Sequence, residues 1–211
     1  MPAFEQILPL HPGLRSTTRL RRLVRDGSAA STRDWLILIS AGVIATCAST
    51  FLDYNLKIPG HAILRVTFPM AIGLALVPRR GAGSVMGVVA IITAVVLRIG
   101  GAGGDGMSLG ALTSLATTGP LMDLTLRRTN GGWKQYLAFA GAGLTSNLLA
   151  FAVRGGAKLL GFEHGGGRRL GSWLAQAAIT YPVCGILAGL ISGAIWFYAR
   201  RRSERAAEET P

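Results

Sequence analysis

The residues of this chain that could do chemistry are polar side chains inside, or at the ends of, long apolar segments. His61 and Arg65 are four positions apart, which places both on one face of a helix. If that face lines a pocket, the guanidinium of Arg65 offers a planar pair of donors to a carboxylate or a phosphate. The other interpretation is that Arg65 extends along the helix surface to the lipid headgroups. The sequence favours neither of the two.

Four further polar residues are predicted to lie at the same end of the molecule. Polar groups that converge on an apolar cavity are typical of a small-molecule site. Asn and Gln between membrane helices can also serve only to join those helices. We predict that the four residues, together with His61 and Arg65, form a substrate-binding site. The four are Arg98, Asp105, Asn147 and Gln176.

One acidic residue is expected to have a local role instead. Asp123 lies near the end of the fourth apolar segment, four positions before Arg127. Oppositely charged side chains at this spacing attract each other on a helix surface. We therefore expect an ion pair between these two residues.

The elements that must position these side chains are six apolar segments. Half of the residues are hydrophobic, and they occur in blocks rather than with the period of a surface helix or strand. Blocks of this length can cross a hydrocarbon core about 30 Å thick as helices. Gly is abundant, with 29 residues, and small residues let membrane helices approach closely. The predicted spans are Trp35–Leu52, His61–Val77, Gly83–Ile99, Met107–Leu126, Trp133–Val153 and Trp173–Tyr198.

The distribution of Lys and Arg predicts the orientation of these spans. With six spans and the N-terminus inside, the inner segments hold 15 basic residues and the outer segments hold six. Cytoplasmic loops collect Lys and Arg, so both termini are predicted to be cytosolic. The four tryptophans lie at or near segment ends, where indole rings favour the headgroup level.

The predicted fold class is therefore all-α: an integral membrane bundle of about six transmembrane helices, with the N- and C-termini inside. We expect three parts along the chain. Residues 1–34 form a basic cytosolic tail, residues 35–199 form the membrane domain, and residues 200–211 form a second cytosolic tail.

Composition and motifs argue against other classes of protein. The net charge is +12, but the basic residues are dispersed among the connections and do not alternate with aromatic residues, so nucleic-acid binding is not expected. The sequence signatures of zinc proteases, serine hydrolases and P-loop ATPases are absent, so we expect no enzymatic activity in this chain. Cys47 and Cys184 lie in apolar segments without C-x-x-C spacing, which argues against a disulfide framework.

A row of small residues marks the first apolar segment. Ala41 and Ala45 are four positions apart, and Ser49 extends the row by one more turn. Such a narrow face suits close packing against another helix. The partner helix could belong to this chain or to a second subunit.

The stretch 58–124 resembles, in its layout, the substrate-binding membrane subunits (S components) of energy-coupling-factor (ECF) transporters. It is most similar to the cobalt/nickel-uptake type, and the similarity covers about a third of the chain. The resemblance is carried by the order of short motifs, which are Gly60-His61, Gly73, Pro78, Asp105-Gly106, Leu109-Gly110-Ala111 and Gly119-Pro120.

This resemblance implies a function that depends on partner subunits. S components dock on a transmembrane coupling subunit through an Ala-x-x-x-Ala face of their first helix, which Ala41 and Ala45 would supply, with Ser49 beside them. Separate ATPase subunits would use ATP, and this chain would hold no cofactor itself. The expected partners are the lipid bilayer, the coupling subunit, the ATPase subunits and a small-molecule solute, in the cell membrane.

The sequence departs from the cobalt/nickel-uptake type in two places. Subunits of that type begin with Met-His, whereas this chain begins Met1-Pro2. Their Leu-Gly-Ala helix carries Asn residues where this chain has Leu112 and Leu115. Both departures weaken the expectation of a metal substrate.

A metal site also needs more ligands than the sequence offers. At least three ligands are required for Co²⁺ or Ni²⁺, and imidazole is the natural one. Of the three histidines, only His61 qualifies, because His11 lies in the tail and His164 lies in a different outer loop. Arg65 would in addition place a cation one turn from His61. We therefore predict no metal ligands and expect a small organic anion, such as a vitamin or its precursor, as the solute.

The function predicted from the sequence is that of a solute-binding subunit of an ECF-type, ATP-driven importer. Two alternatives stay open. The chain could be a membrane scaffold or anchor that transports nothing, or it could be a Co/Ni uptake subunit.

Overall fold

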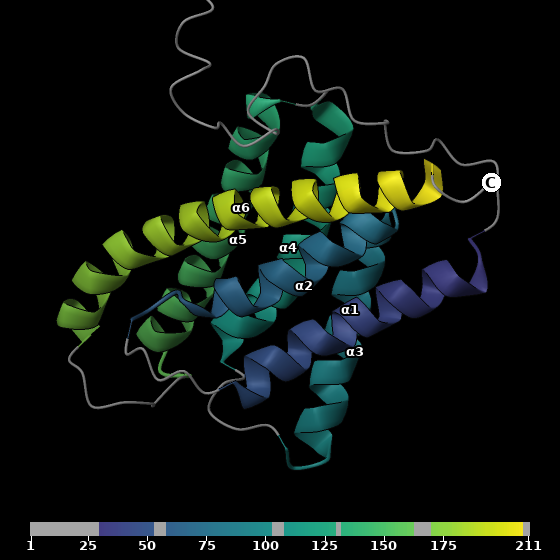
Figure 1. Cartoon of the computed structure of the whole chain (residues 1–211). Helices are drawn as coiled ribbons and strands as arrows, with labels where there is room; N and C mark the ends of the chain where they lie inside the picture. Colours follow the sequence, from purple (N-terminus) through teal and green to yellow (C-terminus); the bar gives the residue numbers. More distant parts are fainter. Residues whose placement is uncertain (1–29, 53–57, 103–107, 130–131, 163–169, 209–211) are drawn as a thin grey trace, which may run out of the picture.

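A computed structural model describes residues 30–52, 58–102, 108–129, 132–162 and 170–208. These residues form six helices, which Figure 1 shows with the labels used here. The helices are α1 (Thr32–Phe51), α2 (Ala62–Leu76), α3 (Ala82–Ile99), α4 (Leu109–Arg128), α5 (Trp133–Leu159) and α6 (Leu170–Glu208).

The helices form two layers that cross each other. In Figure 1, α1, α2 and α6 run in front of α3, α4 and α5. Within the front layer α2 contacts both α1 and α6, and within the second layer α4 contacts both α3 and α5. Between the layers α1 packs on α3, α2 on α4 and α6 on α5. The main apolar core therefore lies where the two layers meet.

Helix length and composition suit a membrane. Among the described residues, α1, α3, α5 and the part Gly171–Arg200 of α6 are long and apolar enough to cross a bilayer. Helix α2 is apolar but has only 15 residues, and α4 is less apolar. The prediction of an all-helical bundle whose helices suit a membrane is confirmed. The number of membrane crossings and the inside location of both termini stay predictions.

Two helices extend beyond the predicted spans. Helix α5 continues past Val153 to Leu159, and α6 continues past Tyr198 to Glu208. With 39 residues, α6 is about 58 Å long, which exceeds a hydrocarbon core of about 30 Å. The predicted tail over 200–211 thus begins as a continuation of α6, and Arg200 is buried there.

Large apolar side chains cover the outer surface of the bundle. Isolated exposed apolar residues are common in soluble proteins, but contiguous apolar patches mark a contact with protein or membrane. Here apolar side chains that are more than half exposed occur on helices of both layers, and they include Ile44, Val88, Ile92, Leu137 and Ile179. This outer surface suits the hydrocarbon of a bilayer.

Glycine lets the helix backbones touch where they cross. A Cβ on Gly83 of α3 would lie 2.2 Å from the carbonyl oxygen of Gly119 on α4. A Cβ on Gly143 of α5 would lie 2.3 Å from the carbonyl oxygen of Gly185 on α6. No side chain fits at such distances. The abundance of Gly therefore reflects close helix packing, as the sequence predicts.

The small-residue face of α1 packs within the chain. Ala41, Ala45 and Ser49 are all buried. Beside them, the hydroxyl of Thr46 donates a hydrogen bond of 2.8 Å to the carbonyl oxygen of Ala90 on α3. Contacts within this chain thus account for the narrow face, and the docking of a second subunit there stays a prediction.

Tryptophans at segment ends have two different environments. Trp35 and Trp133 are about half exposed, as expected for rings at the headgroup level. Trp173 and Trp196 are buried and pack against aromatic rings of α5. Of the four tryptophans at or near predicted segment ends, only two are therefore surface residues.

Asp123 and Arg127 do not form the expected close ion pair, although the charge of Arg127 still acts on the carboxylate. A carboxylate oxygen of Asp123 accepts hydrogen bonds from the backbone N–H of Ser84, at 3.1 Å, and from the Ser84 hydroxyl, at 3.4 Å. Both groups belong to the first turn of α3, where a negative charge is favourable. Asp123 thus joins α4 to the start of α3, and within the described residues Arg127 makes no ion pair with it.

A pair of substitutions tests the role of glycine in packing. A Cβ on Gly189 would lie 2.2 Å from the Phe139 carbonyl oxygen, so we expect Gly189→Ala to lower the free energy of unfolding by about 1–3 kcal/mol. Gly141→Ala is the matched control, because nothing lies within 4 Å of a Cβ there. It should be neutral or stabilise by about 0.5–1 kcal/mol. The measurement is unfolding of the detergent-solubilised protein, and equal losses in both variants would contradict the close contact.

Candidate functional site

A small polar cavity lies where α2 and α4 begin and α5 and α6 pack against them. Its volume is about 60 Å³, which is room for a few water molecules but less than the roughly 300–1,000 Å³ of a pocket that encloses a whole ligand. Two of the six predicted site residues, His61 and Asn147, line it. The polar lining consists of His61, Ser108, Ser114, Asn147, Arg154 and Tyr181.

Asn147 holds three elements together at this cavity. It is buried on α5, and its side-chain nitrogen donates hydrogen bonds to the carbonyl oxygens of Gly60, at 3.1 Å, and Tyr181, at 2.7 Å. Gly60 precedes α2 and Tyr181 lies on α6. Asn147 therefore joins parts of the bundle through hydrogen bonds. This is one of the two roles that the sequence leaves open for it, the other being contact with a solute.

The backbone conformation just before α2 requires glycine at position 60. Gly60 has φ of +86°, in the left-handed region that favours glycine. A Cβ there would also lie 3.0 Å from Cα of Tyr181 and 3.1 Å from the side-chain nitrogen of Asn147. Glycine thus allows the chain to turn into α2 directly against α5 and α6.

Both ring nitrogens of His61 are engaged. Nδ1 lies 2.6 Å from the carbonyl oxygen of Ile58, and Nε2 lies 2.5 Å from a guanidinium nitrogen of Arg65. A carbonyl only accepts and a guanidinium only donates, so Nδ1 carries the proton and Nε2 accepts. A metal ion at His61 would have to displace one of these partners, and the described residues hold no group of three His, Cys, Asp or Glu that could bind one.

Arg65 closes the end of α1. One guanidinium nitrogen donates to the carbonyl oxygens of Leu52 and, at 3.4 Å, Ser49. The last carbonyls of a helix have no partner within the helix, and a cation there is favourable. Arg65 does not line the cavity. Its observed contacts are therefore those of a clamp between α1 and α2, which neither sequence interpretation included.

Arg154 is the cationic side chain of the cavity wall. It is not among the site residues predicted from the sequence, because the apolar pattern of the sequence ends just before it. The predicted fifth span ended at Val153, but α5 continues for almost two more turns. Arg154 lies seven residues after Asn147, hence on the same face of α5. Its guanidinium lies 6.0 Å from the ring centre of Trp173 on α6. Continuing the helical period past Val153 would have identified it.

Gly110 on α4 makes room for that arginine. A Cβ there would lie 3.4 Å from side-chain carbons of Arg154 and 3.3 Å from the Ala150 carbonyl oxygen. Gly110 and Ala111 at the start of α4 thus form the part of the wall beside Arg154. Ser108 caps this helix, its hydroxyl oxygen accepting from the backbone N–H of Ala111 at 3.3 Å.

The electrostatic character of the cavity is positive. Helices α2 and α4 both begin at its wall, and the N-terminal end of a helix carries partial positive charge. Arg154 brings a guanidinium that also lies against Trp173, and the described lining residues include no carboxylate. The arrangement favours a negatively charged group, such as a carboxylate or a phosphate.

The other predicted site residues do not meet at this cavity. Arg98 is exposed at the end of α3, and Gln176 is exposed on α6. Neither lines the cavity. Asp105 lies outside the described residues. The cavity therefore gathers His61 and Asn147 from the predicted set and adds Arg154.

The clamp role of Arg65 can be tested by stability. We expect Arg65→Ala to lower the free energy of unfolding by about 1.5–3 kcal/mol, the loss of charge-assisted hydrogen bonds. Arg65→Lys should recover only part of this, because an ammonium cannot reproduce the planar fork. Arg98→Ala, at an exposed position, is the control and should stay within about 0.5 kcal/mol of wild type. Wild-type stability of Arg65→Ala in detergent would refute the clamp.

Comparison with known protein families, with curated proteins and with solved structures found no match. The similarity to ECF S components rests on the order of motifs in the sequence alone. What the site does must therefore be argued from its residues.

Proposed function

We propose that this chain is the solute-binding membrane subunit of an ECF-type, ATP-driven importer and that its solute is a small organic anion. The observation that carries the proposal is the cavity itself, where Arg154 and two helix N-termini border a space with no carboxylate among its described lining residues. In a membrane protein, ionisable groups within the bundle are functional candidates by default.

The size of the cavity defines which part of a solute it would hold. A volume of about 60 Å³ accommodates a carboxylate or a phosphate group rather than a whole vitamin-like molecule. Ile58 and Ser108 line the cavity, and each is the first described residue after a segment outside the described residues. The proposed solute would place its anionic group in the cavity, and the rest of the molecule would lie outside it.

The proposal assigns the remaining steps to partners. This sequence contains no phosphate-binding loop of the ATPase type, so separate ATPase and coupling subunits would supply energy and movement. In this assembly the chain is a multi-pass protein of the cell membrane, and with the N- and C-termini inside, the cavity faces the outside.

A scaffold function has one observation in its favour. An apolar groove of about 430 Å³ lies between α1 and α2, on the outer surface of the bundle. Such a groove could contact another membrane component without any transport. The Co/Ni alternative is less well supported, because His61 uses both ring nitrogens within the chain.

Substitution of the cavity arginine tests the solute proposal. A thermal-shift screen of the solubilised protein against small carboxylates, phosphates, Co²⁺ and Ni²⁺ would first identify a ligand. We then expect Arg154→Gln to weaken binding of an anion by about 10- to 150-fold, the loss of a charge-assisted bond worth about 1.5–3 kcal/mol.

Lys158→Gln is the matched control for this experiment. Lys158 contacts the same Trp173 ring, at 5.2 Å, but does not line the cavity. Its variant should bind the anion as wild type does. Equal weakening in both variants would indicate a general effect of charge, and stabilisation by Co²⁺ or Ni²⁺ alone would favour the metal alternative.

The orientation can be tested separately. The inner segments carry the excess of basic residues, so both termini should be cytosolic. We therefore expect a reporter that works in the cytosol to be active when fused at Pro2 or at Pro211, and a reporter that works only outside the cell to be inactive there. Activity of a reporter that works only outside the cell, at either end, would contradict this orientation and place the cavity on the opposite side.

A further inference from the structure

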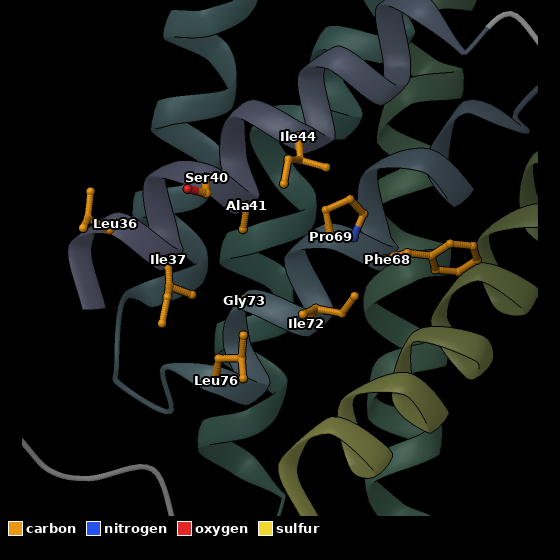
Figure 2. A pocket seen from close by; sticks show the side chains of 10 residues that line it. All are labelled: Leu36, Ile37, Ser40, Ala41, Ile44, Phe68, Pro69, Ile72, Gly73 and Leu76. Atoms are coloured by element: carbon orange, nitrogen blue, oxygen red, sulfur yellow. The ribbon is translucent and has the colours of Figure 1, made fainter. Parts of the chain in front are cut away.

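A groove between α1 and α2 opens on the outer surface of the bundle. Its volume is about 430 Å³, within the range of ligand sites. Figure 2 shows Ile37 and Ala41 of α1 pointing toward Gly73 and Ile72 of α2. Of the residues that line it, only Ser40 has a polar side chain. In a membrane protein such an open apolar groove faces hydrocarbon.

Small residues form the floor of this groove. A Cβ on Gly73 would lie 3.0 Å from Cβ of Ala41, so the two helices touch at this point. Larger side chains stand on either side of the contact, with Ile44 and Pro69 at one end and Leu76 at the other. The result is a channel along the helices rather than a flat face.

The length of the groove is close to the thickness of one bilayer leaflet. From Leu36 to Ile44 the lining of α1 extends over nine residues, which is about 12 Å along a helix. Half of a hydrocarbon core about 30 Å thick is close to this length. Beyond Ile44, Arg65 joins α1 and α2 through the carbonyl oxygens of Ser49 and Leu52.

Positive charge lies at the surface end of the groove. Arg33 precedes Ile37 by one helical turn on α1, and Arg80 follows Leu76 by four residues. Both arginines are exposed. Between them, Arg79 pairs with Asp34 at 3.2 Å, which ties the end of α2 to the start of α1. Basic groups beside a gap between membrane helices are typical of sites for anionic lipid headgroups.

We propose that this groove binds one anionic phospholipid, with an acyl chain in the groove and the phosphate beside Arg33 and Arg80. The one-leaflet depth favours a lipid over a transmembrane helix, because a helix crossing the bilayer would contact both leaflets. The exposed arginines favour an anionic headgroup over a zwitterionic one. This lipid site is separate from the anion cavity and does not depend on the proposed transport function.

The experiment is lipid retention measured by native mass spectrometry. The purified full chain is equilibrated with an equimolar mixture of phosphatidylglycerol and phosphatidylcholine that have the same acyl chains. Wild type should retain phosphatidylglycerol preferentially. Arg33→Gln and Arg80→Gln should each reduce this preference by about five-fold, since one basic residue at the surface contributes about a five-fold attraction to anionic lipid. Arg128→Gln, an exposed arginine of α4, is the matched control and should keep the preference.

A second variant tests the acyl chain. Ser40→Trp fills the groove from an exposed position and should abolish retention of both lipids. Ala178→Trp, at an exposed position on α6, controls for the added indole and should retain lipid as wild type does. Equal retention of the two lipids by wild type, an equal effect of Arg128→Gln, or unchanged retention in Ser40→Trp would each overturn the proposal. Release of a co-purifying membrane protein by Ser40→Trp, with lipid retention unchanged, would show that a protein occupies the groove instead.

Discussion

Contact between helix backbones at glycine is the constraint on which the rest of this structure depends. In a membrane the hydrophobic effect does not drive helices together, so association requires close packing and hydrogen bonds between them. Gly143 and Gly185 bring α5 and α6 together across the two layers, and Gly83 and Gly119 do the same for α3 and α4 within one layer. These contacts fix where the first turn of α4 and the last turns of α5 lie, and hence where the polar cavity forms.

Several polar side chains within the bundle satisfy backbone groups of other helices. Thr46 bonds to a carbonyl of α3, Asn147 to carbonyls before α2 and on α6, and Arg65 to the last carbonyls of α1. The bonds of Arg65 matter most, because the last carbonyls of a helix have no partner within it and an unpaired carbonyl in hydrocarbon is costly. An intramembrane polar residue is therefore a functional candidate only after its partners are known. By that criterion Arg65 and Asn147 hold the scaffold of the site, and Arg154, which lies against Trp173, forms part of its wall.

The fold class could be predicted from the sequence because long apolar segments that contain many glycines are typical of helices packed in a membrane. The six helices were located to within a few residues at most ends. The continuation of α5 past Val153 was missed, because Arg154 and Lys158 interrupt the apolar pattern without breaking the helix. Gln176, which is exposed, could not be distinguished from Asn147, which is buried, because both are amides in apolar segments. The clamp by Arg65 was also beyond reach, since it depends on where α1 ends relative to α2.

The small polar cavity and the groove are both lined in part by α2, and this relates the two ends of the bundle. Helix α2 begins at the cavity with His61 and ends beside the groove with Leu76. With 15 residues it is the shortest helix among those described, about 22 Å long, so the two sites lie near opposite ends of one helix. Arg65 fastens this element to α1 between the two sites. A movement of α2 against α1 would therefore change both the groove and the cavity, and it would have to break the hydrogen bonds of Arg65 and the ion pair between Arg79 and Asp34.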